Sequence, residues 1–399
     1  MNNKKEEYDV AIIGGGPVGG TTAAVLADKK HSVAVFEKKP SVGEPLQCAG
    51  LITPRVFDYT VASKSKTVQN TIKGANIHPP SDHVLSVGGD KKHALVINRI
   101  KFDKEIIKVA KKQNAKFFTE NKAIKFKRKN KKIFFETPKK KQVECKLLIG
   151  ADGANSVVRK KFDFPQPREK LIGIGAEIEN TCLNPDFVEI FVGNNIAPGF
   201  FAWVIPINKD GSKARVGLCT TASSSLSSKK CFQKFLESKK TSKFFDKPVL
   251  NKKIAGVIPL GYLPETYKDQ ILLIGDAAAQ VKPTSGGGIY PGLVAAKHAI
   301  DVISSSFEKQ DLSSYSLKEY HKRWTADVGK EIKKSLHFRK IFCKLTDRQM
   351  DKYIKKLQDP KVIDVINEYG DIDYPSNLVR PLLTKKPSLL KLLPAYFKK

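Results

Sequence analysis

The chain has 399 residues, of which 41% are hydrophobic and 28% are charged. This composition excludes a disordered, collagen-like or low-complexity protein, and the length is typical of two or three domains. Lysine and arginine together number 71, aspartate and glutamate 40, and the formal net charge is +31. A charge of this sign favours anionic partners, such as nucleic acid, an acidic membrane surface or a phosphorylated molecule.

Three absences narrow the class of protein. No apolar run reaches the roughly 18 residues of a transmembrane helix, and residues 1–8 lack the apolar core of a signal peptide. The six cysteines are scattered without a Cys-x-x-Cys pair, and the seven histidines show no metal-ligand spacing. We therefore expect a cytoplasmic protein with neither a disulfide framework nor a metal site.

The start of the chain predicts a βαβ unit. Residues 8–14 form a continuous apolar run, as expected for a strand that is buried on both faces of a parallel sheet. A glycine-rich turn follows, then a helix over 21–30 made of small and apolar residues, and a second buried strand over 32–37.

The remaining pattern predicts an α/β domain that is split by an inserted antiparallel sheet. An irregular loop covers 41–55, a helix 102–112, lysine-rich strands 122–146 and a buried strand 147–151. Alternating strands follow at 172–178, 187–192, 201–206 and 214–220, and a Ser-rich loop with a helix cap at 221–228. A parallel strand returns at 270–275, a helix covers 291–305, and the chain beyond 330 is mostly helical with breaks at Gly370, Pro375, Pro381, Pro387 and Pro394.

We expect the following division of the chain. A dinucleotide-binding domain has its first part at 1–165 and its second part at 266–330. The antiparallel-sheet domain, which would bind the substrate, covers 166–265, and a helical region covers 331–399.

The first chemical motif is Gly14-x-Gly16-x-x-Gly19, between a strand and a helix. Glycines allow a tight turn and a close approach of the backbone to a pyrophosphate, whose charge the helix N-terminus stabilises. Glu37, at the end of the second strand, is placed to bind ribose hydroxyls. This context predicts a dinucleotide site, whereas an isolated glycine triplet would be weak support for one.

Two later segments indicate which dinucleotide. Gly150-Ala-Asp152-Gly153, continuing to Arg159, resembles the second fingerprint of the flavoprotein hydroxylases. Gly275-Asp276-Ala277 with Pro283 and Gly286–Ile289 resembles their third fingerprint, in which the Asp contacts the ribitol chain and the glycine loop lies near the isoalloxazine. The resemblance implies FAD as the cofactor and a p-hydroxybenzoate-hydroxylase-like fold of Rossmann type.

Three further segments resemble the geranylgeranyl reductase family. These are Gly43-Glu-Pro-Leu-Gln-Cys48-Ala-Gly50, Phe201-Ala-Trp203-Val-Ile-Pro206 and Asn98-Arg99-x-x-Phe102-Asp103, and the likeness extends from about residue 8 to 330. Within that family the chain is most similar to the archaeal group that saturates geranylgeranyl chains of membrane glycerophospholipids. Ala49, Phe201 and Ile205 depart from the family motifs, which leaves the prenyl substrate open.

The resemblance implies a reaction and a set of site residues. Reduced FAD would deliver a hydride from N5 to an isolated C=C bond, which the protein must hold in a dry apolar tunnel. Cys48 and Trp203 are the candidate catalytic residues; the alternative for Cys48 is a small buried apolar residue, and the alternative for Trp203 is sheet core. The candidate FAD-binding residues are Gly14, Gly16, Val18, Gly19, Glu37, Cys48, Ala49, Arg99, Ala123, Asp152, Gly153, Asp276, Gly287, Gly288 and Ile289.

The expected partners follow from charge and family. Either NAD(P)H or a reduced ferredoxin-like carrier is a suitable electron donor, and an anionic membrane surface is a suitable site for a lipid-modifying protein. The basic, leucine-rich stretch 376–399 is typical of an interfacial amphipathic segment, or of a helix packed on the protein body. We therefore expect a peripheral protein on the inner face of the cell membrane. No nucleic-acid recognition motif accompanies the charge.

Three alternatives use the same fold or cofactor. A flavin-dependent monooxygenase or halogenase shares the fold, and Trp203-Val-Ile-Pro206 matches half of a halogenase motif, but the lysine-bearing halogenase loop has no convincing match. A quinone-reducing electron-transfer flavoprotein would need an iron–sulfur segment with clustered cysteines. A non-catalytic flavoprotein carrier would be reduced without forming a product.

Overall fold

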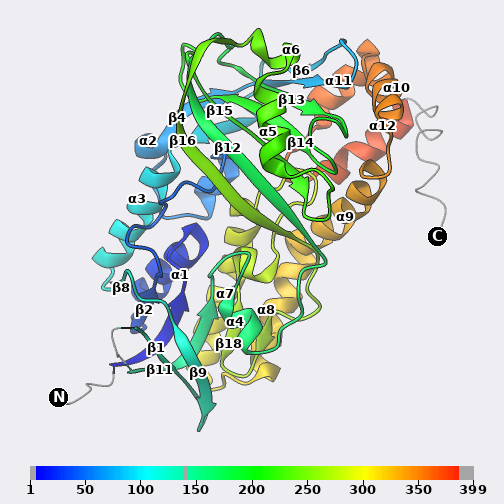
Figure 1. Ribbon diagram of the computed structural model, residues 1–399. Coiled ribbons are helices and arrows are strands. Elements are labelled where there is room, and N and C mark those ends of the chain that lie inside the picture. The colour runs from blue at the N-terminus through cyan, green and yellow to red at the C-terminus, as the bar shows by residue number, and fades with distance from the viewer. Residues whose placement is uncertain (1–5, 139–141, 386–399) are drawn as a thin grey trace.

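The computed structural model describes residues 6–138 and 142–385 (Figure 1). Its largest sheet has the strand order β17-β18-β11-β1-β2-β8, and β10 and β9 extend it from β11. The strands are β1 (Glu6–Ile13), β2 (Val33–Phe36), β8 (Lys116–Phe118), β9 (Ile124–Lys129), β10 (Lys132–Glu136), β11 (Gln142–Gly150), β17 (Tyr267–Lys268) and β18 (Ile271–Leu273). The five strands β8, β2, β1, β11 and β18 run parallel to one another, as predicted for a dinucleotide-binding domain, whereas β10 and β17 pair antiparallel with β11 and β18.

Helices cover one face of this sheet because the central strands carry apolar side chains on both faces. The helices α1 (Pro17–Asp28), α3 (Arg99–Lys112), α7 (Ile289–Glu308) and α8 (Ser314–Trp324) pack there, around Val10, Ile12 and Val35. Ala11 and Ile13 alternate onto the other face and join a second cluster with β10 and β11. The short helix α4 (Val157–Lys161) lies on that second face.

A second sheet of seven strands lies beside the first, at the top of Figure 1. Its order is β16-β12-β15-β14-β13-β5-β6. The strands are β5 (Gly74–His78), β6 (Leu85–Gly88), β12 (Glu169–Thr181), β13 (Phe187–Val192), β14 (Phe201–Pro206), β15 (Lys213–Thr221) and β16 (Phe245–Leu260). One face is covered by α5 (Ser228–Leu236), next to α6 (Lys239–Ser242), and the other face meets the large sheet and its loops.

Two strands of this second sheet come from outside 166–265. The strands β5 and β6 precede that segment by about 80 residues, and β5 pairs in parallel with β13, so the sheet is not wholly antiparallel. Sequence alternation alone does not report which distant strand will cover the open edge of β13. The domain boundaries given above therefore stay a prediction.

A small third sheet joins the other two. It has the order β3-β7-β4, with β3 (Leu51–Ile52), β4 (Val68–Ile72) and β7 (Ala94–Ile97), and the short helix α2 (Lys64–Thr67) leads into β4. The irregular loop 41–50 ends at β3. This loop is the one that carries the candidate residue Cys48.

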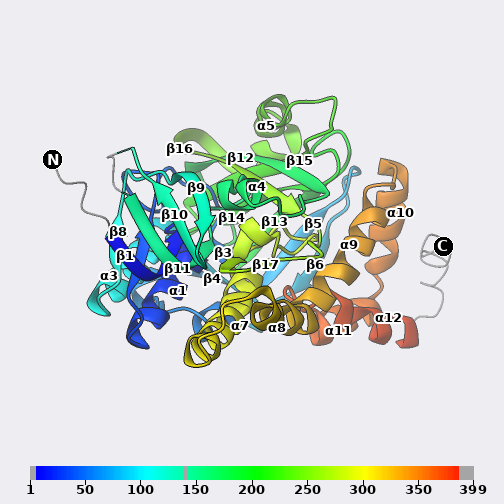
Figure 2. The ribbon, with the colours of Figure 1, turned by 90° about the horizontal axis from the view of Figure 1, so that it is seen from below.

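The C-terminal helices lie along the far edge of the seven-stranded sheet (Figure 2). They are α9 (Lys330–Phe342), α10 (Asp347–Leu357), α11 (Pro360–Tyr369) and α12 (Val379–Lys385). Asn367 Oδ1 accepts a hydrogen bond from the Gly88 N–H of the edge strand β6 at 2.6 Å, so this edge is covered. None of the described helices is both long and apolar enough to cross a membrane.

Three predicted boundaries were wrong. The helix α1 begins at Pro17 rather than at residue 21, because proline fits the first turn of a helix and Gly19 and Gly20 are needed for close packing. The strand β11 is continuous from Gln142, since no turn residue interrupts it before residue 147. Pro381 lies in the first turn of α12, where proline is tolerated, and does not break it.

Other predicted breaks in the tail have different outcomes. Gly370 directly follows α11, and Pro375 opens a short 3-10 turn. Pro387 and Pro394 lie outside the described residues. The predicted interfacial stretch 376–399 is described only to residue 385, and no residue of α12 is buried.

Candidate active site

The glycine turn after β1 is built by direct backbone contact. Gly14 has a φ of +106°, and a Cβ there would clash with the carbonyl of Ala151 at the end of β11. A Cβ on Gly19 would clash with the carbonyl of Gly14. The first two fingerprints predicted from the sequence therefore meet, and the turn tolerates only glycine at these two positions.

The same turn leaves room for a ligand at the N-terminus of α1. A Cβ added to Gly16 or to Gly153 would meet no heavy atom of the described chain within 4 Å. Asp152 caps α4 by accepting the Val157 N–H at 2.6 Å with Oδ2, whereas its buried Oδ1 has no partner among the described residues. Open space, a helix N-terminus and an unpartnered acceptor suit a polar, phosphate-bearing ligand.

Glu37 lies at the end of β2, beside this turn. Its side chain accepts hydrogen bonds from the backbone N–H groups of Gly15 and Lys39, both at 2.9 Å. These bonds fix the carboxylate next to the glycine turn, where a ribose would bind. Ala123 packs in the buried cluster that contains Phe36, the last residue of β2.

The third fingerprint lies against the first. After β18 the chain makes a 3-10 turn over Gly275–Ala278, and Val18 of α1 contacts Gly275. The glycine loop 286–288 returns to this turn, because a Cβ on Gly288 would clash with Asp276 Oδ1. Ile289, the first residue of α7, follows directly. The predicted ribitol contact and the predicted isoalloxazine loop are therefore neighbours.

Charge at this position is set by burial and by two arginines. Burial raises the pKa of Asp276 to about 6, and Arg99 and Arg159 counteract this rise. Arg159 donates to the carbonyls of Ala277 and Ala154, at 2.8 and 2.6 Å. It thereby fastens the second fingerprint to the third from within the core.

Arg99, which acts on Asp276, also interacts with Cys48 in the loop before β3. Arg99 Nη2 lies 2.9 Å from Asp103 Oδ2, one turn along α3. Burial lowers the pKa of Arg99, but Asp103 and Cys48 raise it by more, so the guanidinium stays charged. The Gly50 N–H donates to Cys48 Sγ at 3.3 Å. Arg99 thus interacts electrostatically with both Cys48 and Asp276.

The aromatic wall of β14 lies against the glycine loop and consists of Phe200, directly before the strand, and Phe201 and Trp203 within it. Phe200 Cζ lies 3.4 Å from the position that a Cβ on Gly286 would take. Phe200 stacks on Phe201, and Phe201 makes an edge contact with Trp203 at a centroid distance of 6.0 Å. Trp203 also contacts the cluster that includes Ala49, and its buried Nε1 has no partner among the described residues.

Two buried charges that sequence reasoning missed adjoin the site. Lys282 Nζ lies 2.7 Å from Asp373 Oδ1, and Thr53 Oγ1 donates to Asp373 Oδ2 at 2.6 Å. The side chain of Asp373 is fully buried and that of Lys282 is 10% exposed. The one available signal was a lysine within an otherwise apolar fingerprint, next to Pro283.

A third missed residue is Arg215, a single cation in the apolar strand β15. Nη1 of Arg215 donates to the carbonyl of Ala49 at 2.9 Å, and Nη2 donates to Gln69 Oε1 at 3.0 Å. The charge inside an alternating apolar run was a signal for a buried ion pair.

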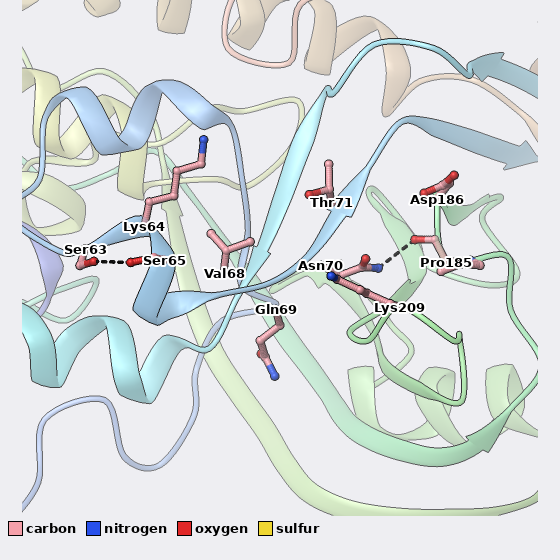
Figure 3. A pocket seen from close by; sticks show the side chains of 10 residues that line it. All are labelled: Ser63, Lys64, Ser65, Val68, Gln69, Asn70, Thr71, Pro185, Asp186 and Lys209. Carbon is pink, nitrogen blue, oxygen red and sulfur yellow. Dashed lines mark hydrogen bonds between the residues drawn. The ribbon is translucent and has the colours of Figure 1, made fainter.

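An open pocket of about 930 Å³ lies elsewhere, between β4 and the loops at 185–186 and 209 (Figure 3). Most of its lining residues are polar or charged, and Asn70 donates to the carbonyl of Pro185 at 2.8 Å. None of its lining residues is a predicted site residue. One of its lining residues, Gln69, accepts a hydrogen bond from Arg215.

The residues at the fingerprints fit FAD. The open space at Gly16 suits a pyrophosphate, Glu37 suits a ribose, and the loop at 286–288 presents backbone against the aromatic wall. The buried Ser285 Oγ beside that loop has no partner in the described part of the chain. No group of three or more metal-ligating side chains occurs among residues 6–138 and 142–385.

The fold and these turns define an FAD-binding flavoprotein. Residues 7–304 match the family described as FAD binding domain, which confirms the predicted cofactor and fold class. Two proteins from Methanocaldococcus jannaschii are similar to this chain over nearly all of its length. An uncharacterized protein is 36% identical and covers 94% of each chain. A digeranylgeranylglycerophospholipid reductase is 30% identical and covers 100% of this chain and 99% of the relative.

The solved structures agree on the fold. A geranylgeranyl bacteriochlorophyll reductase-like protein of Thermoplasma acidophilum has a TM-score of 0.84 at 22% identity, covering 98% of this chain and 100% of that one. Two flavin-dependent halogenating enzymes share the fold at TM-scores of 0.70 and 0.72. The chain belongs to the family of FAD-binding flavoproteins that includes the digeranylgeranylglycerophospholipid reductases, as its motifs predicted.

Proposed function

We propose that this protein is an FAD-dependent reductase that saturates C=C bonds in the geranylgeranyl chains of membrane glycerophospholipids. One observation carries the proposal: the Cys48 loop, the glycine loop at 286–288 and the aromatic wall of β14 converge. The relative that is named a digeranylgeranylglycerophospholipid reductase aligns along this whole chain, which supports the same substrate class.

The residues at this junction suit an uncharged substrate. An alkene offers no charge or hydrogen-bonding group, so a protein must hold it by shape in an apolar space that excludes water. Phe200, Phe201 and Trp203 provide such a surface beside the glycine loop. When bound, FAD supplies the hydride for one alkene carbon.

Cys48 is the candidate group for the second carbon. Its side chain interacts with Arg99, and the adjacent Ala49 packs against the same apolar cluster as Trp203. A thiol there would transfer a proton or would close the apolar space over the chain. Both roles require the loop to keep its position against the sheet.

The test of the function is anaerobic. The purified flavoprotein is reduced with dithionite and mixed with a digeranylgeranylglycerophospholipid, and the lipid is analysed by mass spectrometry. We expect stepwise gains of about 2 Da per reduced bond together with flavin reoxidation. Absence of any gain, combined with an oxygenated or halogenated product from a small aromatic in air, would assign the protein to the monooxygenase or halogenase class instead.

Replacement of Cys48 tests its part in the reaction. Cys48→Ala should keep the flavin spectrum but lose or alter alkene reduction, measured as rate and product pattern. Cys231→Ala is the matched control, because Cys231 lies on the buried face of α5, in a cluster that does not include the Cys48 loop. Normal turnover and an unchanged product pattern in Cys48→Ala would remove Cys48 from the mechanism.

We also propose that the protein acts on the inner face of the cell membrane and is reduced there by NAD(P)H or a ferredoxin-like carrier. The net charge of +31 supports attraction to an anionic lipid surface. Cosedimentation with anionic vesicles that weakens as salt increases, and no cosedimentation with neutral vesicles, is the expected result. Equal recovery with both vesicle types would contradict it.

A further inference from the structure

Arg215 occupies a position where a charge is costly. It is the third residue of β15, between the apolar residues Ala214 and Val216, and is 2% exposed. An ionised side chain in such a place must have its charge and its donors satisfied by the surrounding protein. The partners of Arg215 therefore show what this residue holds together.

The guanidinium connects two sheets. Its Nε donates to Glu177 Oε1 on the adjacent strand β12 at 3.0 Å. The other contacts lie outside the seven-stranded sheet: Nη1 donates to the carbonyls of Ala49 and Ile97, at 2.9 and 2.8 Å, and Nη2 to Gln69 at 3.0 Å. Ala49 precedes β3, Ile97 ends β7 and Gln69 lies on β4, so all three belong to the small sheet or its entry.

This contact reaches the backbone next to Cys48. Gly50 has a φ of +71°, and a Cβ there would clash with Nη1 of Arg215. The backbone of 49–50 is thus pressed against the guanidinium on one side. On the other side, the Gly50 N–H donates to Cys48 Sγ at 3.3 Å. The direction of the Cys48 side chain therefore depends on a backbone segment that Arg215 holds.

We propose that Arg215 is a positioning residue that fixes the Cys48 loop against the substrate-binding sheet for alkene reduction. The catalytic role of Cys48 rests on the proposed function. The proposal that Arg215 fixes the position of Cys48 does not. A planar guanidinium donates to four acceptors in fixed directions, which an ammonium group cannot do. Lysine at position 215 would keep the charge and lose the geometry.

The first experiment compares wild-type holoenzyme with Arg215→Lys. Iodoacetamide labelling followed by peptide mass spectrometry gives the alkylation rate of Cys48, and the exposed Cys182 provides an internal reference. We expect the Cys48 rate to change by at least threefold while the reference rate stays constant. In the lipid assay, kcat should fall at least tenfold with KM nearly unchanged.

Arg339→Lys is the matched control. Arg339 is also a buried arginine that pairs with a carboxylate, Glu169, and donates to a backbone carbonyl, that of Gly199 at 2.8 Å. It contacts no residue of the Cys48 loop in any hydrogen bond of the described chain. Its replacement should lower stability and leave the Cys48 alkylation rate unchanged, which separates positioning from a loss of fold stability.

A second variant covers the case in which Arg215→Lys does not fold. The side chain of Gln69 is half-buried, and Gln69→Ala removes one of the four hydrogen-bond acceptors of Arg215. We expect a smaller change in the alkylation rate of Cys48, of about twofold. Wild-type alkylation in folded Arg215→Lys, or in Gln69→Ala when the lysine variant fails to fold, would overturn the proposal. If wild-type protein reduced no lipid, the alkylation rates would still test the positioning, so the two proposals fail separately.

Discussion

The glycine turns that suit FAD and the junction around Cys48 are built in different ways. The turns consist of backbone against backbone: Gly14 lies against Ala151, and Gly19 lies against Gly14 itself. The junction depends on side chains from distant parts of the chain, such as Arg215 against Ala49 and Asp373 against Thr53. Sequence motifs specify the first kind of site, whereas the second kind is visible only after folding.

The largest expected effect is the loss of stability on replacing Gly14, which we compare with the replacement of Gly16 in the same turn. Gly14→Ala should destabilise the protein by about 4 kcal/mol or more, because the φ is positive and the added Cβ meets backbone. Gly16→Ala should cost about 0.5 kcal/mol, since its φ of −67° is allowed and the space beside it is open.

The same variant should lose FAD affinity although it keeps its stability. Gly16→Ala should bind FAD at least tenfold more weakly than wild type, because the methyl group enters the space that suits a pyrophosphate. Urea unfolding and flavin titration measure the two quantities. Undiminished FAD affinity in Gly16→Ala would place the pyrophosphate elsewhere.

The next effect concerns the junction. Asp373→Asn leaves Lys282 buried beside a neutral group, and breaking a buried pair in this way costs about 3–5 kcal/mol. Urea unfolding of single and double variants with Lys282→Met gives the coupling between the two residues. Additive losses would show that the pair is not coupled, and the junction would then depend less on distant charges than we infer.

The third effect is a pH dependence at the third fingerprint. Burial raises the pKa of Asp276 to about 6 from 3.8, so the folded state binds this proton more tightly than the unfolded chain. The stability that the protonation of Asp276 contributes is fully present below pH 3.8 and is lost as the pH rises through about 6.

Asp276→Asn removes this dependence. In flavin-free protein the variant should be more stable than wild type at pH 7 and should lose that advantage as the pH falls below about 4. Thermal unfolding at a series of pH values measures the difference. An identical pH profile in both proteins would contradict a raised pKa.

The smallest expected effect is the loss of an exposed ion pair, which serves as the reference for the buried pair Lys282–Asp373. Lys66 Nζ lies 2.9 Å from Glu105 Oε1, and the side chain of Lys66 is 60% exposed. Glu105→Gln should change the free energy of unfolding by less than about 1 kcal/mol, and still less at high salt. A loss as large as that of Asp373→Asn would remove the distinction between buried and exposed charge pairs in this chain.

The extent of correct prediction follows the same division. The βαβ unit, the three fingerprints, FAD and the family follow from short segments in which each residue is set by its neighbours. Arg99 interacts electrostatically with both Cys48 and Asp276, whereas the roles of these three residues stay predictions.

Sequence reasoning missed what depends on separation along the chain. It did not find that β5 and β6 complete the second sheet, because a strand carries no mark of a partner more than 100 residues away. It overlooked Arg215, Lys282 and Asp373, whose neighbours in sequence say nothing of their partners in space. Pro381 was judged by residue type alone, whereas its position in the first turn of α12 decides its effect.

The Thr53–Asp373 hydrogen bond has a consequence for the order of folding. The two residues are 320 positions apart, so this contact closes a loop that contains every strand of the seven-stranded sheet but not β1 and β2 of the largest sheet. Loop-closure entropy rises only slowly with length, but a contact of this range forms after the elements that carry its ends are in place. The βαβ unit with its glycine turn can therefore assemble early, and the chain completes the surroundings of Lys282 last.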